Sequence, residues 1–359
     1  PMISKQWFLK VEPLVKKSLE AMKKGDVKFA TKRFEKIAKN WYKNLRDWNI
    51  SRQIVWGIRI PAYRCEKCME WTITDGETPK ECVSCHNNIL KQDEDTFDTW
   101  FSSAQWPYAT LLSGLNSKLQ ITNDKYSDGG KDSDFNRFYP TSVMETAYDI
   151  LPFWVIRMIM LGLYVTGKVP FKEVVIHGLV RDREGQKISK SKGNVINPIE
   201  MADKYGADAL RMGLLWGASV ENDVSLSEEN INAQRKFSNK IWNAARFVLQ
   251  IENEVQINEE FKKRIDSVTR ETTKYLNKYQ LSQAAELLYS EFWHWFCDEC
   301  IESSKEGKIG ANQMKSGLIT FLKLLHPFMP FVTEQIWSLG FARDKNDSEL
   351  LITSSWPAP

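Results

Sequence analysis

The stretch ILPFWVIRMIMLGLYV, from Ile150 to Val165, followed by EVVIHG, from Glu173 to Gly178, decides the fold class. The first run is almost wholly apolar, which predicts a helix that is buried on most of its surface. The second run is short and β-branched, which predicts a strand that ends at the glycine. A strand that follows such a helix is expected to lie parallel to a neighbouring strand. The sequence from Tyr139 onward therefore predicts an α/β domain.

Helical patterns surround this region on both sides. A polar loop from Arg181 to Asn197 follows the strand, and Met201 to Trp216 is predicted to be one helix, with Pro198 just before its start. After Ser227 the strand signals end and helical periodicity dominates, which predicts a separate helical bundle. The further predicted helices are Pro13–Lys24, Thr31–Asn44, Ile231–Asn253, Phe261–Tyr279, Leu281–Ser303 and Met314–Leu325.

Length and composition favour a soluble globular protein with two or three domains. The chain has 359 residues, 42% of them hydrophobic, and a formal net charge of +3, which does not by itself require a nucleic-acid partner. The apolar run from Ile150 to Val165 is at or below the length of a membrane span and contains Arg157, so a buried helix is expected instead. No signal-peptide pattern is found, and the cysteine spacing is typical of metal binding rather than of disulfides. We expect no membrane partner and a cytoplasmic location.

Four cysteines form the strongest metal-binding pattern. Cys65 and Cys68 make one C-x-x-C pair, Cys82 and Cys85 a second, and 13 residues lie between the pairs. Such pairs suit tetrahedral zinc, because each short loop directs two thiolates at one ion. Four protein ligands leave no open position, so the zinc is predicted to be structural. The alternatives are four free thiols in a loop, or His86 as a ligand in place of Cys85.

A third C-x-x-C pair, Cys297 and Cys300, lies within the aromatic sequence EFWHWFCDEC. The two cysteines share one face of a predicted helix, and no second pair follows them. Core packing is therefore expected, rather than metal or redox chemistry.

The string KISKS, Lys187 to Ser191, followed by KGN at 192–194, is the most informative functional pattern. Lysine ammonium groups, serine hydroxyls and backbone N–H groups in a loop after a strand can bind phosphate. Gly193 permits close approach of the backbone to a ligand. Composition alone leaves a phosphate loop and an exposed basic turn equally open.

This string resembles the KMSKS signature of class I aminoacyl-tRNA synthetases, with Ile188 in place of Met. Further segments along nearly the whole chain are similar to the valyl members of that family. They are WNISRQ (48–53), WGIRIP (56–61), DTWFSSA (98–104), FYPTS (138–142), DILPFW (149–154) with Arg157-Met158, HGLVRD (177–182), and LHPFMP (325–330) with Glu334 and Trp337.

The resemblance implies ATP-dependent ligation of valine to tRNA(Val) through a valyl-adenylate, with Mg²⁺ accompanying ATP. Lys187 and Lys190 would stabilise the charge that develops as pyrophosphate leaves, which is electrostatic transition-state stabilisation. Lys190, Ser189 and Ser191 would contact ATP directly.

The resemblance also assigns residues outside the loop. Asp149 would bind the ATP ribose, and His177 and Gly178 would lie beside the adenosine. Trp56 and Trp100 would wall the amino-acid pocket. The alternatives are ordinary core packing for each tryptophan and, for Asp149, a helix N-terminal position favoured by the dipole.

Two departures from the family pattern stand out. Ala147 occupies the position where the family usually has glycine, two residues before the ribose aspartate, and its methyl group is expected to crowd the nucleotide. No HIGH-type signature is found, so the first half of the nucleotide-binding domain and the editing domain are expected to belong to a missing amino-terminal part. The isolated chain is accordingly expected to be inactive, and that missing part is a predicted partner.

The predicted fold is α/β plus all-α: residues 1–59 belong to a partial Rossmann-type catalytic domain, 60–95 form a zinc-ribbon insert, 96–228 form the second catalytic half, and 229–359 form an anticodon-binding bundle. Two alternative functions remain open. One is an isoleucyl or leucyl specificity, since one methylene changes binding by only ~1–3 kcal/mol. The other is a non-catalytic tRNA-binding module.

Overall fold

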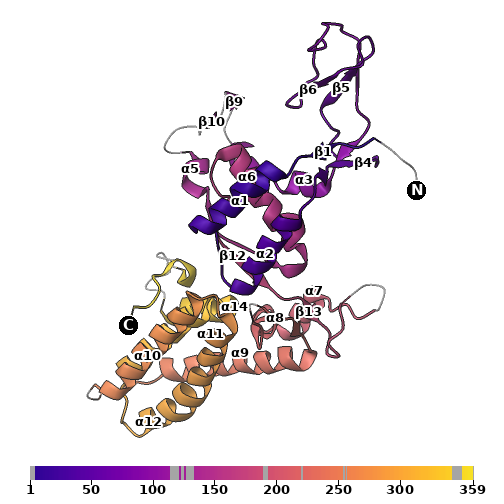
Figure 1. Cartoon of the computed structure of the whole chain (residues 1–359). Helices are drawn as coiled ribbons and strands as arrows, with labels where there is room; N and C mark the ends of the chain where they lie inside the picture. Colours follow the sequence, from indigo (N-terminus) through magenta and orange to yellow (C-terminus); the bar gives the residue numbers. More distant parts are fainter. Residues whose placement is uncertain are drawn as a thin grey trace. The chain divides into compact units, whose positions relative to one another are not determined.

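A computed structural model describes residues 5–113, 121–122, 125–126, 133–188, 193–219, 221–253, 255, 257–341 and 350–358 (Figure 1). Contacts divide the chain into two compact units, Pro1–Ile176 and His177–Pro359, called unit 1 and unit 2 below. Each unit is described by itself.

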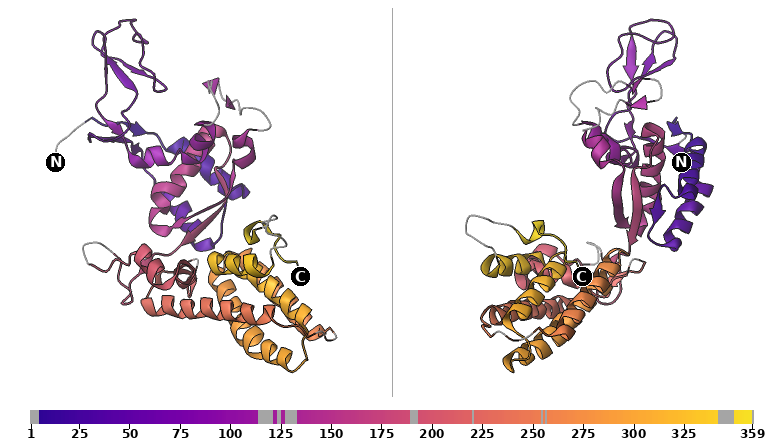
Figure 2. Two further views of the ribbon diagram at one scale, coloured as in Figure 1. Left: turned by 180° about the vertical axis from the view of Figure 1, so that it is seen from behind. Right: turned by 90° about the vertical axis from the view of Figure 1, so that its left-hand side faces the viewer.

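Unit 1 is built on a three-stranded sheet in the order β11-β12-β2. The predicted strand at Glu173 is confirmed, as β12, and it pairs in parallel with β2 through Glu173 and Lys28. Helices α1 and α2 lie beside these strands (Figure 2), and the Tyr42 hydroxyl donates to the carbonyl of Ile156 at 2.8 Å. The bounds are β2 Lys28–Phe29, β11 Thr141–Ala147, β12 Phe171–His177, α1 Glu12–Lys24 and α2 Lys32–Asn44.

The apolar run is the central helix of unit 1, as expected. It consists of a 3₁₀ turn (Tyr148–Ile150), a π-helical turn (Leu151–Val155) and α6 (Ile156–Thr166). Among the described residues this is the one helix whose length and hydropathy would suit a membrane span. Its residues Met158, Ile159 and Met160 are fully buried within the unit, which explains the apolar composition by core packing.

Residues 60–95 form a small antiparallel sheet in the order β6-β5-β7. Short strand pairs, β1 with β3 and β4 with β8, precede and follow this insert. The bounds are β1 Phe8–Leu9, β3 Trp48–Asn49, β4 Ser51–Arg52, β5 Ala62–Cys65, β6 Trp71–Ile73, β7 Leu90–Gln92, β8 Thr96–Phe97, α3 Thr99–Ser103, α4 Trp106–Ser113, β9 Ile121–Thr122, β10 Lys125–Tyr126 and α5 Asp134–Phe138.

Unit 2 begins with a parallel strand pair, β13 (Val180–Arg181) with β14 (Val224–Ser225). The single helix predicted from Met201 to Trp216 is wrong. The structure has two helices, α7 (Pro198–Tyr205) and α8 (Ala207–Leu215), because Gly206 adopts φ +95° and breaks the helical path. Pro198 is the first residue of α7 rather than the residue before a helix, which suits its fixed φ and missing N–H.

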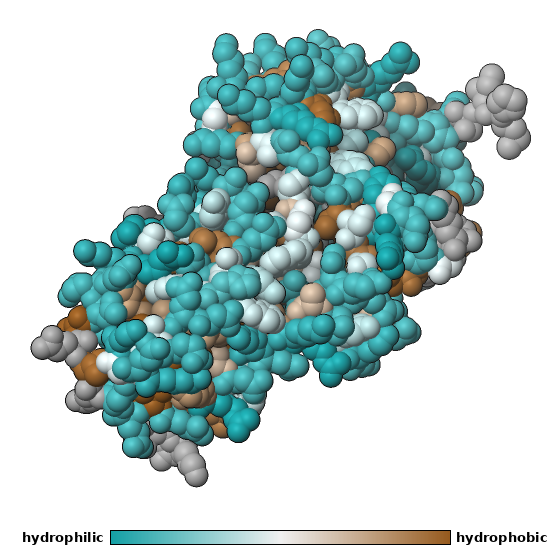
Figure 3. Space-filling view, turned by 90° about the horizontal axis from the view of Figure 1, so that it is seen from below, coloured by the Kyte–Doolittle hydropathy of each residue, from teal (hydrophilic) through white to brown (hydrophobic). Residues whose placement is uncertain are grey.

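The remainder of unit 2 is the predicted helical bundle, and the structure confirms its helices to within a few residues. Phe237, Phe292, Phe296 and Phe321 fill its core, all fully buried. The face drawn in Figure 3 is mainly hydrophilic, with apolar residues in small separate patches. The bounds are α9 Glu228–Leu249, α10 Glu259–Leu276, α11 Leu281–Ser290, a π-helix Glu291–Cys300, α12 Ile301–Lys305, α13 Ala311–Leu325, α14 Pro330–Gly340 and a 3₁₀ turn Leu351–Thr353.

Cys297 and Cys300 lie in this core, 5% and 3% exposed. Burial raises the pKa of each thiol to about 12, so both are uncharged at neutral pH. Their position is that of ordinary core residues, as expected.

Candidate functional site

The four paired cysteines converge at one end of the insert. The Sγ atoms of Cys65, Cys68, Cys82 and Cys85 all lie within 4.8 Å of one another. Cys65 and Cys85 are 3.6 Å apart at sulfur, and Cys68 and Cys82 are 3.5 Å apart. Tetrahedral zinc with Zn–S bonds of ~2.3 Å requires sulfur separations of about 3.8 Å. The donor set and its spacing therefore fit a tetrahedral metal ion.

Backbone donors favour the thiolate form at two of the four cysteines. The Cys68 backbone N–H lowers the pKa of the Cys65 thiol to about 6, and the Ser84 backbone N–H lowers that of Cys82. At Cys68 the Glu70 backbone N–H also lowers the pKa of the thiol, but burial and the neighbouring thiols outweigh it and raise that pKa to about 12. His86 does not join the cluster, because its Nδ1 lies 2.9 Å from Glu81 and its side chain is 74% exposed. Cys85, not His86, is thus the fourth member.

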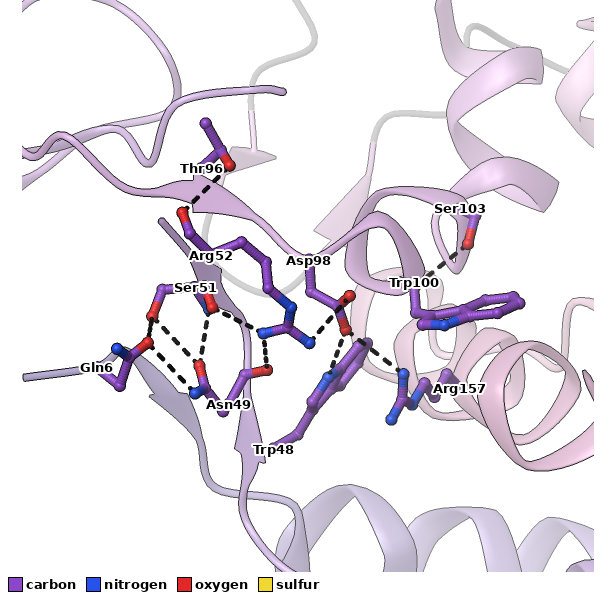
Figure 4. Close-up of polar contacts among 10 residues, drawn as sticks. All are labelled: Gln6, Trp48, Asn49, Ser51, Arg52, Thr96, Asp98, Trp100, Ser103 and Arg157. Atoms are coloured by element: carbon purple, nitrogen blue, oxygen red, sulfur yellow. Dashed lines mark hydrogen bonds and ion pairs between the residues drawn. The ribbon is translucent and has the colours of Figure 1, made fainter. Parts of the chain in front are cut away.

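A second constellation surrounds one buried carboxylate, Asp98, which is 4% exposed (Figure 4). Its oxygens accept a hydrogen bond from Trp48 Nε1 at 3.0 Å and pair with Arg52 at 3.2 Å and Arg157 at 3.6 Å. The Arg157 guanidinium also lies 3.9 Å from the Trp48 ring centroid, a cation–π contact. Burial lowers the pKa of Arg157, and Asp98 opposes this effect. The Arg157–Asp98 pair therefore offsets part of the cost of burying the arginine charge.

Asp98 also begins helix α3, which carries Trp100. Its backbone N–H donates to Ile50 O at 2.7 Å, and its carbonyl accepts from Phe101 N–H at 2.8 Å. An aspartate at this N-cap position usually accepts from the first turn of its own helix, but the Asp98 side chain makes no such bond. The carboxylate is committed to the cluster instead, which ties the start of α3 to three other segments.

Trp100 is half-buried and stacked on Phe153, with ring centroids 5.6 Å apart and planes 26° apart. Phe153 lies in the π-helical turn, and the Arg157 guanidinium is 5.8 Å from its ring. π-Helical turns are frequent at functional sites. The Trp100 ring is therefore held by the same cluster that surrounds Asp98.

Trp56 is 91% exposed, so it is not a core residue. It belongs to the segment 53–58, which is fastened to β8 at both ends. Arg52 pairs with Thr96 at one end, and Phe97 N–H donates to Ile58 O at the other. Both tryptophans assigned to the amino-acid pocket are thus connected to β8. Trp56 lies in the segment that is hydrogen-bonded to this strand, and Trp100 lies in α3, the helix that follows it in sequence.

The lysine loop of unit 2 is fastened at its base. Lys187, which is exposed, forms a β-bridge with Arg181, and Asn194 Nδ2 donates to Asp182 at 2.7 Å and to the Lys187 carbonyl at 3.2 Å. Gly193 has φ +68°, the left-handed conformation that glycine adopts without strain. Ser189, Lys190 and Ser191 lie outside the described residues.

The remaining predicted residues divide between the units. Asp149 is exposed and lies in the 3₁₀ turn of unit 1. Ala147 has φ −73° and ψ 154°, so its backbone conformation does not require glycine. In unit 2, His177 is exposed, whereas Gly178 is buried against the chain before β14. A Cβ atom at Gly178 would lie 2.0 Å from Asn222 O, so close backbone approach explains this glycine.

Four residues that position the site lay within quoted motifs without being assigned a role: Asp98, Arg157, Asp182 and Asn194. Asp98 and Arg157 are charged residues flanked by large apolar side chains, which is a signal for a buried ion pair. Asp182 and Asn194 flank the lysine loop, where short polar side chains often fasten turns.

Two family models match the sequence: tRNA synthetases class I (I, L, M and V) over residues 1–227, and the anticodon-binding domain of tRNA ligase over residues 258–359. The valine--tRNA ligase of Clostridium tetani is 42% identical over 380 residues, which cover 99% of this chain and 41% of the relative. That of Dehalococcoides mccartyi is 41% identical over 354 residues, which cover 94% and 38%. The chain thus spans about two fifths of these curated relatives.

Solved structures share the fold. Mycobacterium tuberculosis methionyl-tRNA synthetase bound by methionyl-adenylate matches with a TM-score of 0.69 and 16% identity, over 99% of this chain and 68% of that chain. Agrobacterium radiobacter K84 agnB2 LeuRS, in a ternary complex with tRNA and LeuAMS, matches with a TM-score of 0.67 and 21% identity, over 88% and 42%. Because the first family model covers more than half of the residues, the chain belongs to the class I tRNA synthetases of the isoleucine, leucine, methionine and valine group.

Proposed function

We propose that these residues form the KMSKS-loop portion of the catalytic domain, and the anticodon-binding bundle, of a valine--tRNA ligase. The observation that carries this proposal is 42% identity to a valine--tRNA ligase across 99% of the chain. The isoleucyl and leucyl alternatives have no comparable support, since the LeuRS likeness is at 21% identity and concerns the fold.

In the proposed reaction the valine carboxylate attacks the α-phosphate of ATP, and pyrophosphate leaves. The valyl group of the adenylate is then transferred to the 3′ end of tRNA(Val). Lys187 and Lys190 supply the cations that stabilise the charge on the departing pyrophosphate. The bond between Asp182 and Asn194 fixes the base of their loop, so that less conformational freedom is lost when ATP binds. Mg²⁺ would accompany the ATP phosphates.

Residues of both units suit the other assigned roles. The Asp149 carboxylate is exposed at the surface of unit 1, and its two oxygens suit two ribose hydroxyl protons. His177 is the last residue of β12 and Gly178 directly follows it, where adenosine would lie. Trp56 and Trp100 offer apolar surface to the valine side chain, and the Asp98 cluster sets the position of Trp100.

The cysteine cluster is proposed to hold one structural zinc ion. Cys65, Cys68, Cys82 and Cys85 supply four thiolates and leave no coordination position for a substrate. The ion would stabilise the small insert, which has little apolar core of its own. A cytoplasmic location agrees with reduced cysteines and with tRNA as the partner.

The test is pyrophosphate exchange by the 359-residue chain joined to the amino-terminal remainder of a curated relative. Valine should support exchange well above isoleucine and leucine. Lys190→Ala should lower the exchange rate by ~10²–10³ while changing valine binding little, because its contact strengthens as pyrophosphate departs. Lys204→Ala, at a lysine that pairs with Glu228 at 2.6 Å instead, is the matched control. Normal exchange by Lys190→Ala would remove the role assigned to that lysine.

The same assay on the unjoined chain separates the catalytic proposal from a binding module. We expect the 359 residues alone to show no exchange and yet to bind tRNA(Val). Exchange by the chain alone would contradict the expectation that a missing amino-terminal part is required.

A further inference from the structure

Unit 2 contains a cavity of about 410 Å³ outside the lysine loop, at the corner where α13 ends, α14 begins and the carboxy-terminal segment returns. Its lining includes Arg211, Lys323, His326, Ile352, Ser354 and Trp356. This volume falls within the ~300–1,000 Å³ that is typical of small-ligand sites.

The cavity favours an anion. Arg211 spends two of its N–H donors on the carbonyls of Phe328 and Pro327, at 3.3 and 2.9 Å, which fixes the guanidinium and leaves further donors. Lys323 Nζ donates to Ser355 O at 3.0 Å and, as an ammonium, has two more protons to donate. Two permanent charges are thus held in place at the cavity wall.

The neighbouring carboxylates are occupied elsewhere. Asp208 accepts from the N–H groups of Phe331 and Val332, at 3.1 and 2.7 Å. Glu334 accepts from the N–H groups of Leu351 and Ile352, at 2.8 and 3.3 Å. Neither acid lines the cavity, so the cavity carries a net positive charge and offers no carboxylate to a magnesium ion.

His326 adds a buried acceptor. Its Nδ1 lies 2.9 Å from Thr333 Oγ1, and that hydroxyl already donates to Met329 O, so the imidazole must donate here. Nε2 then carries the lone pair, and it is buried without a hydrogen-bond partner. Burial lowers the pKa of His326, and the nearby charge of Arg211 lowers it further. The negative charges of Glu334 and Asp208 act in the opposite direction. Glu334 Oε2 lies 3.8 Å from His326 Nε2. A ligand hydroxyl or amino group would supply the missing donor.

An aromatic wall completes the cavity. Trp356 is 39% exposed, and its Nε1 donates to Thr273 Oγ1 at 2.9 Å, which holds the ring. Ile352, which also lines the cavity, is 68% exposed. An exposed, immobilised indole next to fixed cations is the combination that binds nucleotides by stacking and phosphate contact.

We propose that this cavity binds one nucleotide of an RNA chain, with its phosphate on Arg211 and Lys323 and its base against Trp356. An RNA phosphodiester fits better than a free nucleoside triphosphate, because the triphosphate would bring Mg²⁺ to a site without carboxylates. The inference rests on the proposed function, since the RNA would be the tRNA that the ligase charges.

The experiment measures binding of a tRNA(Val) transcript to the 359-residue chain at several salt concentrations. Lys323→Ala should weaken binding and reduce the slope of log K against log salt by about 1. Lys323→Arg, which keeps the charge, should preserve both. Lys315→Ala, on the same helix but outside the cavity, is the matched control and should change neither. Trp356→Ala should weaken binding roughly 5- to 100-fold, and Trp356→Phe much less.

Circular dichroism and thermal melting must show each variant folded, because Lys323 and Trp356 also contact the protein. Unchanged affinity and salt slope in folded Lys323→Ala and Trp356→Ala would overturn the inference, as would an equal loss in Lys315→Ala. AMP binding as tightly as RNA, at the same residues, would overturn the RNA assignment. If the unaltered chain binds no tRNA, the bundle's proposed role fails instead, which separates the two failures.

Discussion

Replacing Asp98 by Asn removes one negative charge from the cluster in unit 1 while keeping an oxygen that can accept from Trp48. The side chains of Arg157 and Asp98 are 13% and 6% exposed, so their pair is largely desolvated. Removing one partner of a buried pair costs ~3–5 kcal/mol. The Arg52 side chain is 41% exposed, so its pair adds at most ~1 kcal/mol.

The cation–π contact with Trp48 survives the substitution and partly compensates Arg157. We therefore expect Asp98→Asn to lower the free energy of unfolding of unit 1 by about 3 kcal/mol. For a unit of this size that corresponds to a fall in melting temperature of roughly 6–12 °C. Urea unfolding followed by tryptophan fluorescence gives the magnitude. Hydrogen exchange of the Asp98 amide, which is bonded to Ile50 O, locates the loss at the start of α3.

Asp93→Asn is the matched control, because Asp93 accepts from Trp7 Nε1 at the same 3.0 Å and forms no ion pair among the described residues. It should cost ~1 kcal/mol. Adding Arg157→Met to Asp98→Asn should recover much of the stability, since the uncompensated charge is then gone. The reasoning is refuted if the two asparagine variants are equally stable, or if Arg157→Met brings no recovery.

Three further predictions concern the cysteine cluster of unit 1 and the residues Gly178 and Asn194 of unit 2. Chelator treatment or Cys68→Ser should remove one zinc per chain and increase hydrogen exchange in residues 60–95 alone. Cys297→Ser, in the bundle core, is the control and should leave the zinc content unchanged. A preparation made without chelators that contains no zinc would contradict the metal proposal. Gly178→Ala should destabilise unit 2 by ~1–3 kcal/mol in thermal melts, because its Cβ would lie 2.0 Å from Asn222 O, whereas Gly213→Ala, with Ile231 at 3.4 Å, should cost little. In the joined enzyme, Asn194→Ala should raise the KM for ATP in pyrophosphate exchange, since the bond to Asp182 at the base of the lysine loop is lost; an unchanged KM would show that the bond is dispensable.

The sequence predicted the elements whose signals are local. The four cysteines are an example, because two C-x-x-C pairs direct their thiolates at one point whatever the rest of the chain does. The buried helix from Ile150 and the strand from Glu173 were confirmed because both are continuous apolar runs.

Signals that depend on distant partners were not predicted. The helix expected from Met201 to Trp216 is broken at Gly206, and nothing in the apolar periodicity marks that break. Asp98 reads as an ordinary helix cap in sequence. Only the fold brings Trp48 and Arg157, 50 and 59 positions away, to its carboxylate.

These residues are proposed to belong to an enzyme that activates valine. The most direct measurement is valine-dependent exchange of pyrophosphate into ATP by the chain joined to the amino-terminal remainder of the Clostridium tetani relative, with the intact relative as positive control. Exchange with valine should exceed exchange with isoleucine or leucine, and Lys190→Ala should reduce it by ~10²–10³. Preference for isoleucine or leucine, or no exchange by a folded joined enzyme when the intact relative is active, would contradict the proposal.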